Sequence, residues 1–147
     1  PGTLRFTSFE AFPMAAGDME RALRPFALPQ TGALVTQWAT AEGPVRHLTL
    51  NGIEAQVIIG DAREALPAWE GAADAWFLDG FAPARNPELW SEALMAEVGR
   101  HTAPLGSCAT YTAAGHVRRA LEAAGFTVTR QSGFGRKKHM THGRKPA

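Results

Sequence analysis

Apolar and polar positions near the start of the chain predict a strand followed by a helix. Residues 4–9 are typical of a short strand. The next apolar side chains recur at i, i+3, i+4 and i+7, which places one apolar stripe on a helix; they are Met19, Ala22, Leu23 and Phe26. Asp18 is suited to cap that helix.

A hairpin and a second strand-helix pattern follow. Residues 46–50 and 54–59 flank the pair "NG" at 51–52, which tolerates the positive φ angles of a type I′ turn. After this predicted hairpin, residues 62–69 favour a short helix and residues 75–78 a buried strand.

The next segment predicts one long helix and one strand. Asn86 and Pro87 are typical of a cap and a first-turn proline, and the helix they open runs to about His101. The letters "PLG" at 104–106 stop the chain before a strand at 107–112.

A last helix and a terminal hairpin complete the pattern. The helix carries an apolar stripe closed by Gly125 as its C-terminal cap; the stripe consists of Val117, Ala120, Leu121 and Ala124. Residues 126–130 and 138–142 are strands close enough in sequence to pair antiparallel around "QSGFGRK".

The order of elements predicts the fold class. Strands that alternate with helices through short connections indicate an α/β fold with a Rossmann-like, mostly parallel sheet and helices on both faces. The C-terminal antiparallel hairpin is the exception to the parallel order. A chain of 147 residues is expected to form one domain, residues 1–147.

Composition indicates a soluble, cytoplasmic protein. The sequence has no apolar run long enough for a membrane span and no secretory signal pattern. Its single cysteine, Cys108, has no partner for a disulfide and lies in an apolar run, so we expect an inert buried thiol in a reducing compartment.

Charge is distributed unevenly along the sequence. Residues 1–122 hold all 14 acids and nine of the 15 Lys and Arg, for a balance of −5, whereas residues 123–147 hold six bases and no acid. A basic end on a mildly acidic body favours a site for a polyanion. A merely solvated basic tail is the alternative.

Three acids follow three predicted strands. Glu10 comes after the first strand, Asp61 after the second arm of the hairpin, and Asp79 after the strand "AWFL". Ligands of open α/β sheets bind beyond the carboxyl ends of the strands, so these acids are candidate site residues on one edge.

Five segments of the chain resemble one known family. They are "LRFTSFEAFPM", "VIIGDAREALP", "DAWFLDGFAPARNPELW", "LGSCATYTAAGHVRRALEAAGF" and "SGFGRKKHM". They are similar to the methyltransferase domains of the bacterial bifunctional tRNA 5-methylaminomethyl-2-thiouridine biosynthesis proteins. The resemblance implies S-adenosylmethionine as cofactor and methylation of the aminomethyl nitrogen on the wobble uridine of tRNA. FAD belongs to a separate oxidase domain of that family, and we do not expect FAD in this domain.

The resemblance also implies a missing segment. The family's Gly-rich cofactor loop follows a first, central strand and should precede Leu4. Without that strand, its neighbours beginning at Leu4 and Ala75 would each present an unpaired edge. We therefore expect an N-terminally truncated domain that binds S-adenosylmethionine weakly on its own.

By resemblance, two acids and one amide hold the cofactor. Glu10 should accept the two ribose hydroxyls, and Asp61 the adenine amino group, with the backbone amide of Ala62 near the ring. The structural alternative for Glu10 is a surface acid that caps the next helix. For Asp61 it is an N-cap of the helix at 62–69, a role compatible with the adenine contact.

Asp79 and Phe81 are the candidate catalytic residues, and Asp79 is also expected to contact the cofactor. A carboxylate can bind the protonated substrate amine, orient it and accept its proton. Gly80 allows close approach of the backbone, and Phe81 offers a face to the uracil or the methyl sulfonium. A plain turn at the end of a strand is the alternative.

The basic end is the candidate surface for the tRNA anticodon loop. A mixture of cations and an aromatic ring suits phosphate contacts and stacking on unpaired bases. Its residues are Arg118, Arg119, Phe134, Arg136, Lys137 and Lys138. His139 and His142 are three apart and would lie on opposite faces of a strand, so no metal site is expected.

Two other functions remain open from the sequence. One is a catalytically silent RNA-binding module that keeps only the basic surface. The other is a different Rossmann-like enzyme, such as a nucleotide-dependent oxidoreductase in which Glu10 holds the ribose of a dinucleotide.

Overall fold

The chain forms two compact units. The computed structural model describes residues 2–135 and 137–147. Contacts group Pro1–Ala65 in the first unit and Leu66–Ala147 in the second. The expectation of a single domain stays a prediction.

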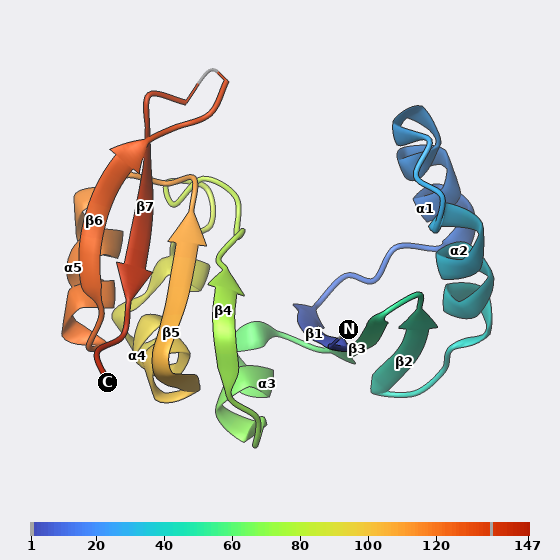
Figure 1. The fold of residues 1–147 in the computed structure, drawn as a ribbon, viewed down its shortest axis with the longest axis horizontal. Coiled ribbons are helices and arrows are strands. Elements are labelled where there is room, and N and C mark those ends of the chain that lie inside the picture. The colour runs from blue at the N-terminus through green and yellow to red at the C-terminus, as the bar shows by residue number, and fades with distance from the viewer. Residues whose placement is uncertain (1, 136) are drawn as a thin grey trace. The chain divides into compact units, whose positions relative to one another are not determined.

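The first unit contains a three-stranded sheet (Figure 1). Its central strand, β3 (Ile53–Ile59), pairs in parallel with β1 (Leu4–Glu10) and antiparallel with β2 (Val45–Leu50). The predicted hairpin is therefore confirmed. The predicted type I′ turn is wrong, because that turn needs two positive φ angles and only Gly52, at +76°, has one.

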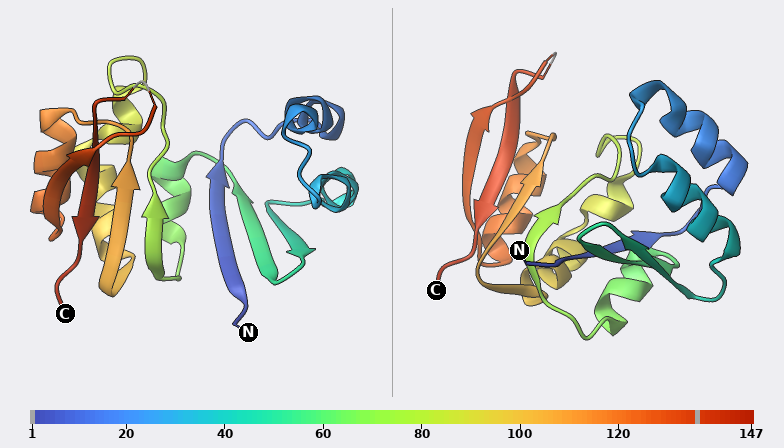
Figure 2. Two further views of the ribbon diagram at one scale, coloured as in Figure 1. Left: turned by 45° about the horizontal axis from the view of Figure 1, so that its top comes forward. Right: turned by 45° about the vertical axis from the view of Figure 1, so that its right-hand side comes forward.

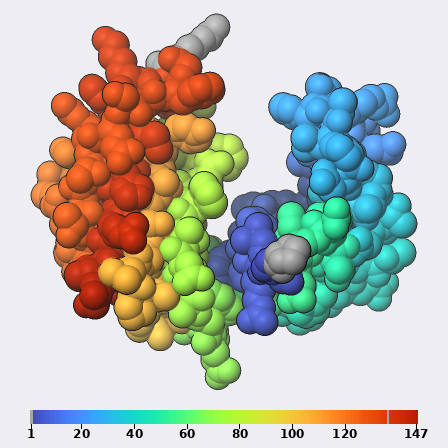
Figure 3. Space-filling view, in the orientation of Figure 1, coloured from blue at the N-terminus to red at the C-terminus, as the bar shows by residue number. Residues whose placement is uncertain are grey.

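Helices of the first unit are α1 (Ala16–Leu23), the 3-10 turn η1 (Arg24–Phe26) and α2 (Thr31–Thr40). Asp18 does not cap α1, because the cap residue is Ala15. Asp18 lies in the first turn and accepts a hydrogen bond from Arg21. The sequence pattern did not predict α2. Figure 3 shows α1 and α2 as one continuous block of atoms in blue to cyan.

Trp38 anchors α2 to the rest of the first unit. Its ring is buried, its Nε1 donates to the carbonyl of Met14 at 2.7 Å, and the guanidinium of Arg46 lies 4.4 Å above its ring. Leu48 is the other large apolar side chain buried among the described residues of this unit. The apolar core of the first unit is therefore small.

The second unit contains a four-stranded sheet in the order β4-β5-β7-β6. β4 (Ala73–Phe77) is parallel to β5 (Thr102–Thr110), which pairs antiparallel with β7 (His139–Arg144). β6 (Thr127–Ser132) pairs antiparallel with β7 and completes the predicted terminal hairpin.

Strand β5 begins earlier than the sequence predicts. The letters "PLG" do not stop the chain; they lie inside the strand as an irregularity, where the partner of β4 jumps from Thr102 to Ser107. Leu105 takes a positive φ of 63° at this point. Such a local kink lets the strand continue although Pro104 cannot donate to a ladder.

Three helices and one 3-10 turn belong to the connections of the second unit. α3 (Ala62–Ala68) is the helix predicted over 62–69, and the boundary between the two units falls within it. The helix predicted over 86–101 is broken into η2 (Pro87–Trp90) and α4 (Glu92–Arg100). Ser91 causes the break, because its Oγ accepts the amide of Leu94 and caps α4.

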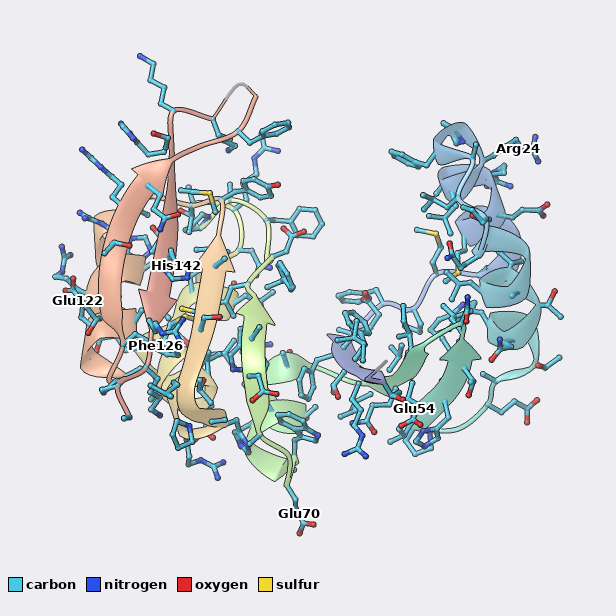
Figure 4. The ribbon with its side chains drawn as sticks, viewed as in Figure 1. Arg24, Glu54, Glu70, Glu122, Phe126 and His142 are labelled. Atoms are coloured by element: carbon cyan, nitrogen blue, oxygen red, sulfur yellow. The ribbon has the colours of Figure 1, made fainter. Side chains whose placement is uncertain are left out.

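Helix α5 (Gly115–Ala123) carries the predicted apolar stripe. Val117, Ala120 and Leu121 are buried, and Gly125 ends the helix with a φ of 91°. α4 and α5 pack on each other and cover one face of the four-stranded sheet (Figures 1 and 2). Phe126, labelled in Figure 4, extends this core at the start of β6 and is only 4% exposed.

The predicted α/β class is confirmed, with mixed sheets: among the described residues two strand pairs are parallel and three are antiparallel. Among the described residues, β1 and β4 each pair on one side only, as the resemblance predicts for the neighbours of a central strand. No helix within residues 2–135 and 137–147 is long and apolar enough to cross a membrane.

Candidate functional site

The carboxyl edge of the first sheet brings Glu10 and Asp61 together. Glu10 is paired with Ile59 in the parallel ladder between β1 and β3. The amide of Gly60 then donates to the carbonyl of Glu10 at 3.0 Å, so the next residue, Asp61, lies beside the end of β1. Neighbouring strands lie about 4.8 Å apart, which puts the two acids in adjacent positions.

Glu10 is half-buried and held by its own loop. Its Oε1 accepts the backbone amide of Phe12 at 2.9 Å. Among the described residues, no hydrogen bond to Oε2 is formed. A carboxylate fixed through one oxygen keeps acceptor capacity for a pair of hydroxyls, which fits the predicted ribose contact.

Asp61 caps α3 and pairs with Arg63. Its Oδ1 accepts the backbone amide of Arg63 at 2.9 Å, which is an N-cap bond, and both carboxylate oxygens accept from the guanidinium. The side-chain hydrogen bonds from Arg63, followed by the backbone bond, lower the pKa of Asp61 to about 2. The N-cap interpretation is confirmed, and the adenine contact stays a prediction for Asp61 and for Ala62, the first residue of α3.

Asp79 and Phe81 lie at the carboxyl end of β4 in the second unit. Pairing with β5 continues to Leu78, whose amide donates to the carbonyl of Ala109 at 2.9 Å. Beyond it, Asp79 is exposed, Gly80 is buried, and Phe81 is 84% exposed with a φ of 62°. A bulky residue in the left-handed region is uncommon and often marks a functional site.

The same edge of the second sheet carries two more exposed rings. β4, β5 and β6 run in one direction, so their carboxyl ends lie at the same edge (Figure 1). Tyr111 follows β5 directly and is 57% exposed; Phe134 lies in the β6–β7 turn and is 82% exposed. Tyr111 was not predicted as a site residue, although its place after β5 corresponds to the place of Asp79 after β4.

Cations surround this edge. Lys137 and Lys138 are exposed in the β6–β7 turn, which closes through bonds from the amide of Gly133 to Lys138 and from Lys137 to Phe134. Arg136 lies outside the described residues.

Two arginines of α5 add to these cations. Arg119 is exposed, and its Nη1 lies 3.2 Å from the position that a Cβ on Gly115 would take, so its side chain reaches back to the start of α5. Arg118 is half-buried, and its Nε has no hydrogen-bond partner among the described residues. Only four residues, 111–114, lie between the end of β5 and the start of α5, which puts both arginines near the carboxyl edge.

The predicted site residues thus form two groups. Glu10, Asp61 and Ala62 share the edge of the first sheet, and Asp79, Phe81 and the basic residues belong to the second. A single site built from both groups stays a prediction. Cys108 is buried, and burial raises the pKa of its thiol to about 11, which agrees with an inert role.

Comparison with known proteins identifies the family. The sequence profile described as S-adenosyl-L-methionine-dependent methyltransferase matches residues 29–146. The chain belongs to this family. Its cofactor is therefore S-adenosylmethionine, and the nucleotide-dependent oxidoreductase considered from the sequence is excluded.

Two relatives of this chain carry the same name. The methyltransferase chain is 45% identical over 144 residues to the tRNA 5-methylaminomethyl-2-thiouridine biosynthesis bifunctional protein MnmC of Pseudomonas aeruginosa strain UCBPP-PA14, covering 95% of this chain and 22% of that protein. It is 44% identical over 141 residues to the protein of the same name from Caulobacter sp. strain K31, covering 92% and 23%. The chain spans about a fifth of the length of the curated relatives it matches.

Solved structures agree on the fold. MNMC2 from Aquifex aeolicus aligns with a TM-score of 0.67 at 21% identity, over 100% of this methyltransferase chain and 56% of the other. The S-adenosylmethionine-dependent methyltransferase SibL in its apo form aligns with a TM-score of 0.52 at 15% identity, over 99% and 51%. These two likenesses support the α/β methyltransferase fold.

Proposed function

We propose that this chain transfers a methyl group from S-adenosylmethionine to the aminomethyl nitrogen of the wobble 2-thiouridine of tRNA, giving 5-methylaminomethyl-2-thiouridine. Similarity to tRNA-modifying proteins at 45% identity supports the substrate. The observation that carries the proposal is the exposed carboxylate of Asp79 at the end of a parallel strand in a chain of the methyltransferase family, next to the exposed ring of Phe81.

Residues of the first sheet edge would hold the cofactor. The free acceptor capacity of Glu10 suits the ribose hydroxyls. Asp61 is anionic at neutral pH, and its two oxygens can accept an amino group in addition to Arg63. When bound, S-adenosylmethionine supplies an electrophilic methyl group on its sulfonium.

Asp79 would prepare the nucleophile. An aliphatic amine is largely protonated at neutral pH and has no lone pair in that form. The Asp79 carboxylate binds the ammonium group, orients it and accepts one of its protons, which frees the lone pair for attack. Because Asp79 is exposed, it can pass that proton to water, and the secondary amine product keeps a proton of its own at neutral pH.

The aromatic and basic residues of the second sheet edge would bind the anticodon loop. Phe81 offers a face to the uracil, and Phe134 can stack on a neighbouring unpaired base. Phosphate contacts would come from Arg118, Arg119, Arg136, Lys137 and Lys138. A tRNA substrate implies action in the cytoplasm.

The test is a transfer assay with the protein as its natural host makes it. Purified protein is incubated with methyl-tritiated S-adenosylmethionine and tRNA that carries 5-aminomethyl-2-thiouridine. The matched control tRNA already carries the methyl group. We expect label in the first tRNA only, recovered in the wobble nucleoside after digestion. Tight tRNA binding without any transfer would instead support the silent RNA-binding module.

A further inference from the structure

Two side chains converge on one backbone carbonyl in the candidate catalytic loop. The carbonyl oxygen of Gly80 accepts a hydrogen bond from Asn86 Nδ2 at 3.2 Å and a second from Trp90 Nε1 at 3.3 Å. Gly80 is buried between two exposed neighbours, Asp79 and Phe81. The loop is therefore fixed at the one residue that separates the two candidate catalytic side chains.

Holding this carbonyl also orients the peptide unit that leads into Phe81. The carbonyl of Gly80 and the amide of Phe81 belong to one planar peptide unit, so fixing the oxygen fixes the direction of the amide. Phe81 has a φ of 62°, a conformation that persists only where the surroundings impose it. The two hydrogen bonds fix the first of the two peptide planes that define this angle. Phe81 itself is 84% exposed.

The donors are themselves anchored. Trp90 is buried at the end of η2, and the next residue, Ser91, caps α4. Gly80 packs closely against this turn, because a Cβ at Gly80 would lie 3.2 Å from two atoms of Leu89. Asn86 precedes η2 as its N-cap residue, with Pro87 in the first turn, as the sequence predicts. Its side chain makes no capping hydrogen bond and donates to the loop instead.

We infer that Asn86 and Trp90 are positioning residues of the methyl transfer. They hold the peptide between Gly80 and Phe81, so that the carboxylate of Asp79 and the ring of Phe81 keep one arrangement toward the substrate. Small displacements of a reacting group cost large factors in rate, so a held loop is effective for catalysis. This inference rests on the proposed function, because the reaction that the loop serves is the proposed one.

Two variants remove one donor each. Asn86→Ala removes the amide, and Trp90→Phe removes the indole N–H while it keeps an aromatic ring in the core. Trp76→Phe is the matched control, because Trp76 Nε1 donates to Thr102 Oγ1 at 2.9 Å elsewhere in the second unit. All three variants are made in the protein as its natural host produces it.

The first readout is the backbone amide of Phe81 in ¹⁵N NMR spectra, which needs neither cofactor nor tRNA. We expect this signal to shift or broaden in Asn86→Ala and Trp90→Phe and to stay unchanged in Trp76→Phe. The second readout is single-turnover transfer to tRNA with aminomethyl uridine. Each of the two variants should lower the rate at saturating S-adenosylmethionine by about three- to tenfold, the range of one lost hydrogen bond.

Two results would overturn the inference. One is an unchanged Phe81 amide in both variants, and the other is a displaced amide with an unchanged transfer rate. If Trp90→Phe fails to fold, Asn86→Ala decides alone, because its side chain is only half-buried. A natural protein that transfers no methyl group would refute the proposed function instead, and the amide spectra would still show whether these donors hold the loop.

Discussion

The backbone of Phe81 should be strained, and glycine should relieve the strain. Left-handed backbone conformation costs an ordinary residue about 1 to 2 kcal/mol, and glycine pays about 0.5 to 1 kcal/mol of extra entropy on folding. The ring of Phe81 is 84% exposed, so its loss contributes little to stability in any variant. Phe81→Gly should therefore be more stable than Phe81→Ala by about 0.5 to 1 kcal/mol.

Transfer activity should respond differently from stability. Both Phe81 variants lack the ring, so both should lose methyl transfer to the same extent, although one is more stable than the other. The assay combines urea unfolding with single-turnover transfer to tRNA. Ala27→Gly is the matched control, because Ala27 has a φ of 48° and is exposed. This variant should gain a similar free energy of unfolding over the natural protein, and its methyl transfer should be unchanged. Equal stability of Phe81→Gly and Phe81→Ala would refute the strain argument, and full transfer by Phe81→Ala would refute the role of the ring.

Three other predictions concern Asp61, the basic turn and the packing of α4 on α5. The pKa of Asp61 is lowered from 3.8 to about 2, so its carboxylate should stabilise the fold fully above about pH 4 and lose this effect as the pH falls toward 2. The urea midpoints of Asp61→Asn should lack that pH dependence. Replacing Lys137 and Lys138 with Ala should lower the slope of log affinity for tRNA against log salt by about 1.4 to 1.8, and an unchanged slope would place the phosphate contacts elsewhere. A Cβ at Gly99 would lie 2.4 Å from the carbonyl oxygen of Ala124, so Gly99→Ala should destabilise the protein by about 1 to 3 kcal/mol in thermal melts, whereas Gly32→Ala, with nothing within 4 Å, should not.

Local patterns predicted much of the fold. The apolar stripe of α5 and its Gly125 cap depend on residues close in sequence, and the structure has both. The β2–β3 and β6–β7 hairpins form for the same reason. Helix α2 was missed because its support is distant: Trp38 bonds to Met14 and contacts Arg46.

The candidate site was predicted unevenly. The rule that ligands bind at carboxyl ends of strands correctly put Glu10 and Asp61 at adjacent positions. The pair between Asp61 and Arg63 was not predicted, although the two residues are close enough in sequence to suggest it. Asn86 was predicted only as a helix cap, because the sequence does not show that the carbonyl of Gly80 lies within hydrogen-bond distance of its side chain.

The most direct test of the central claim is single-turnover methyl transfer by Asp79→Asn across pH. Asparagine keeps the shape of the side chain but removes its charge and its ability to accept the proton. We predict that transfer at neutral pH falls by about 10² to 10⁴-fold and partly recovers in alkali, where more of the amine is already neutral. Asp74→Asn, which changes an exposed acid on β4, should keep full activity. Near-normal transfer by a folded Asp79→Asn at neutral pH would contradict the account and leave Asp79 as a turn residue.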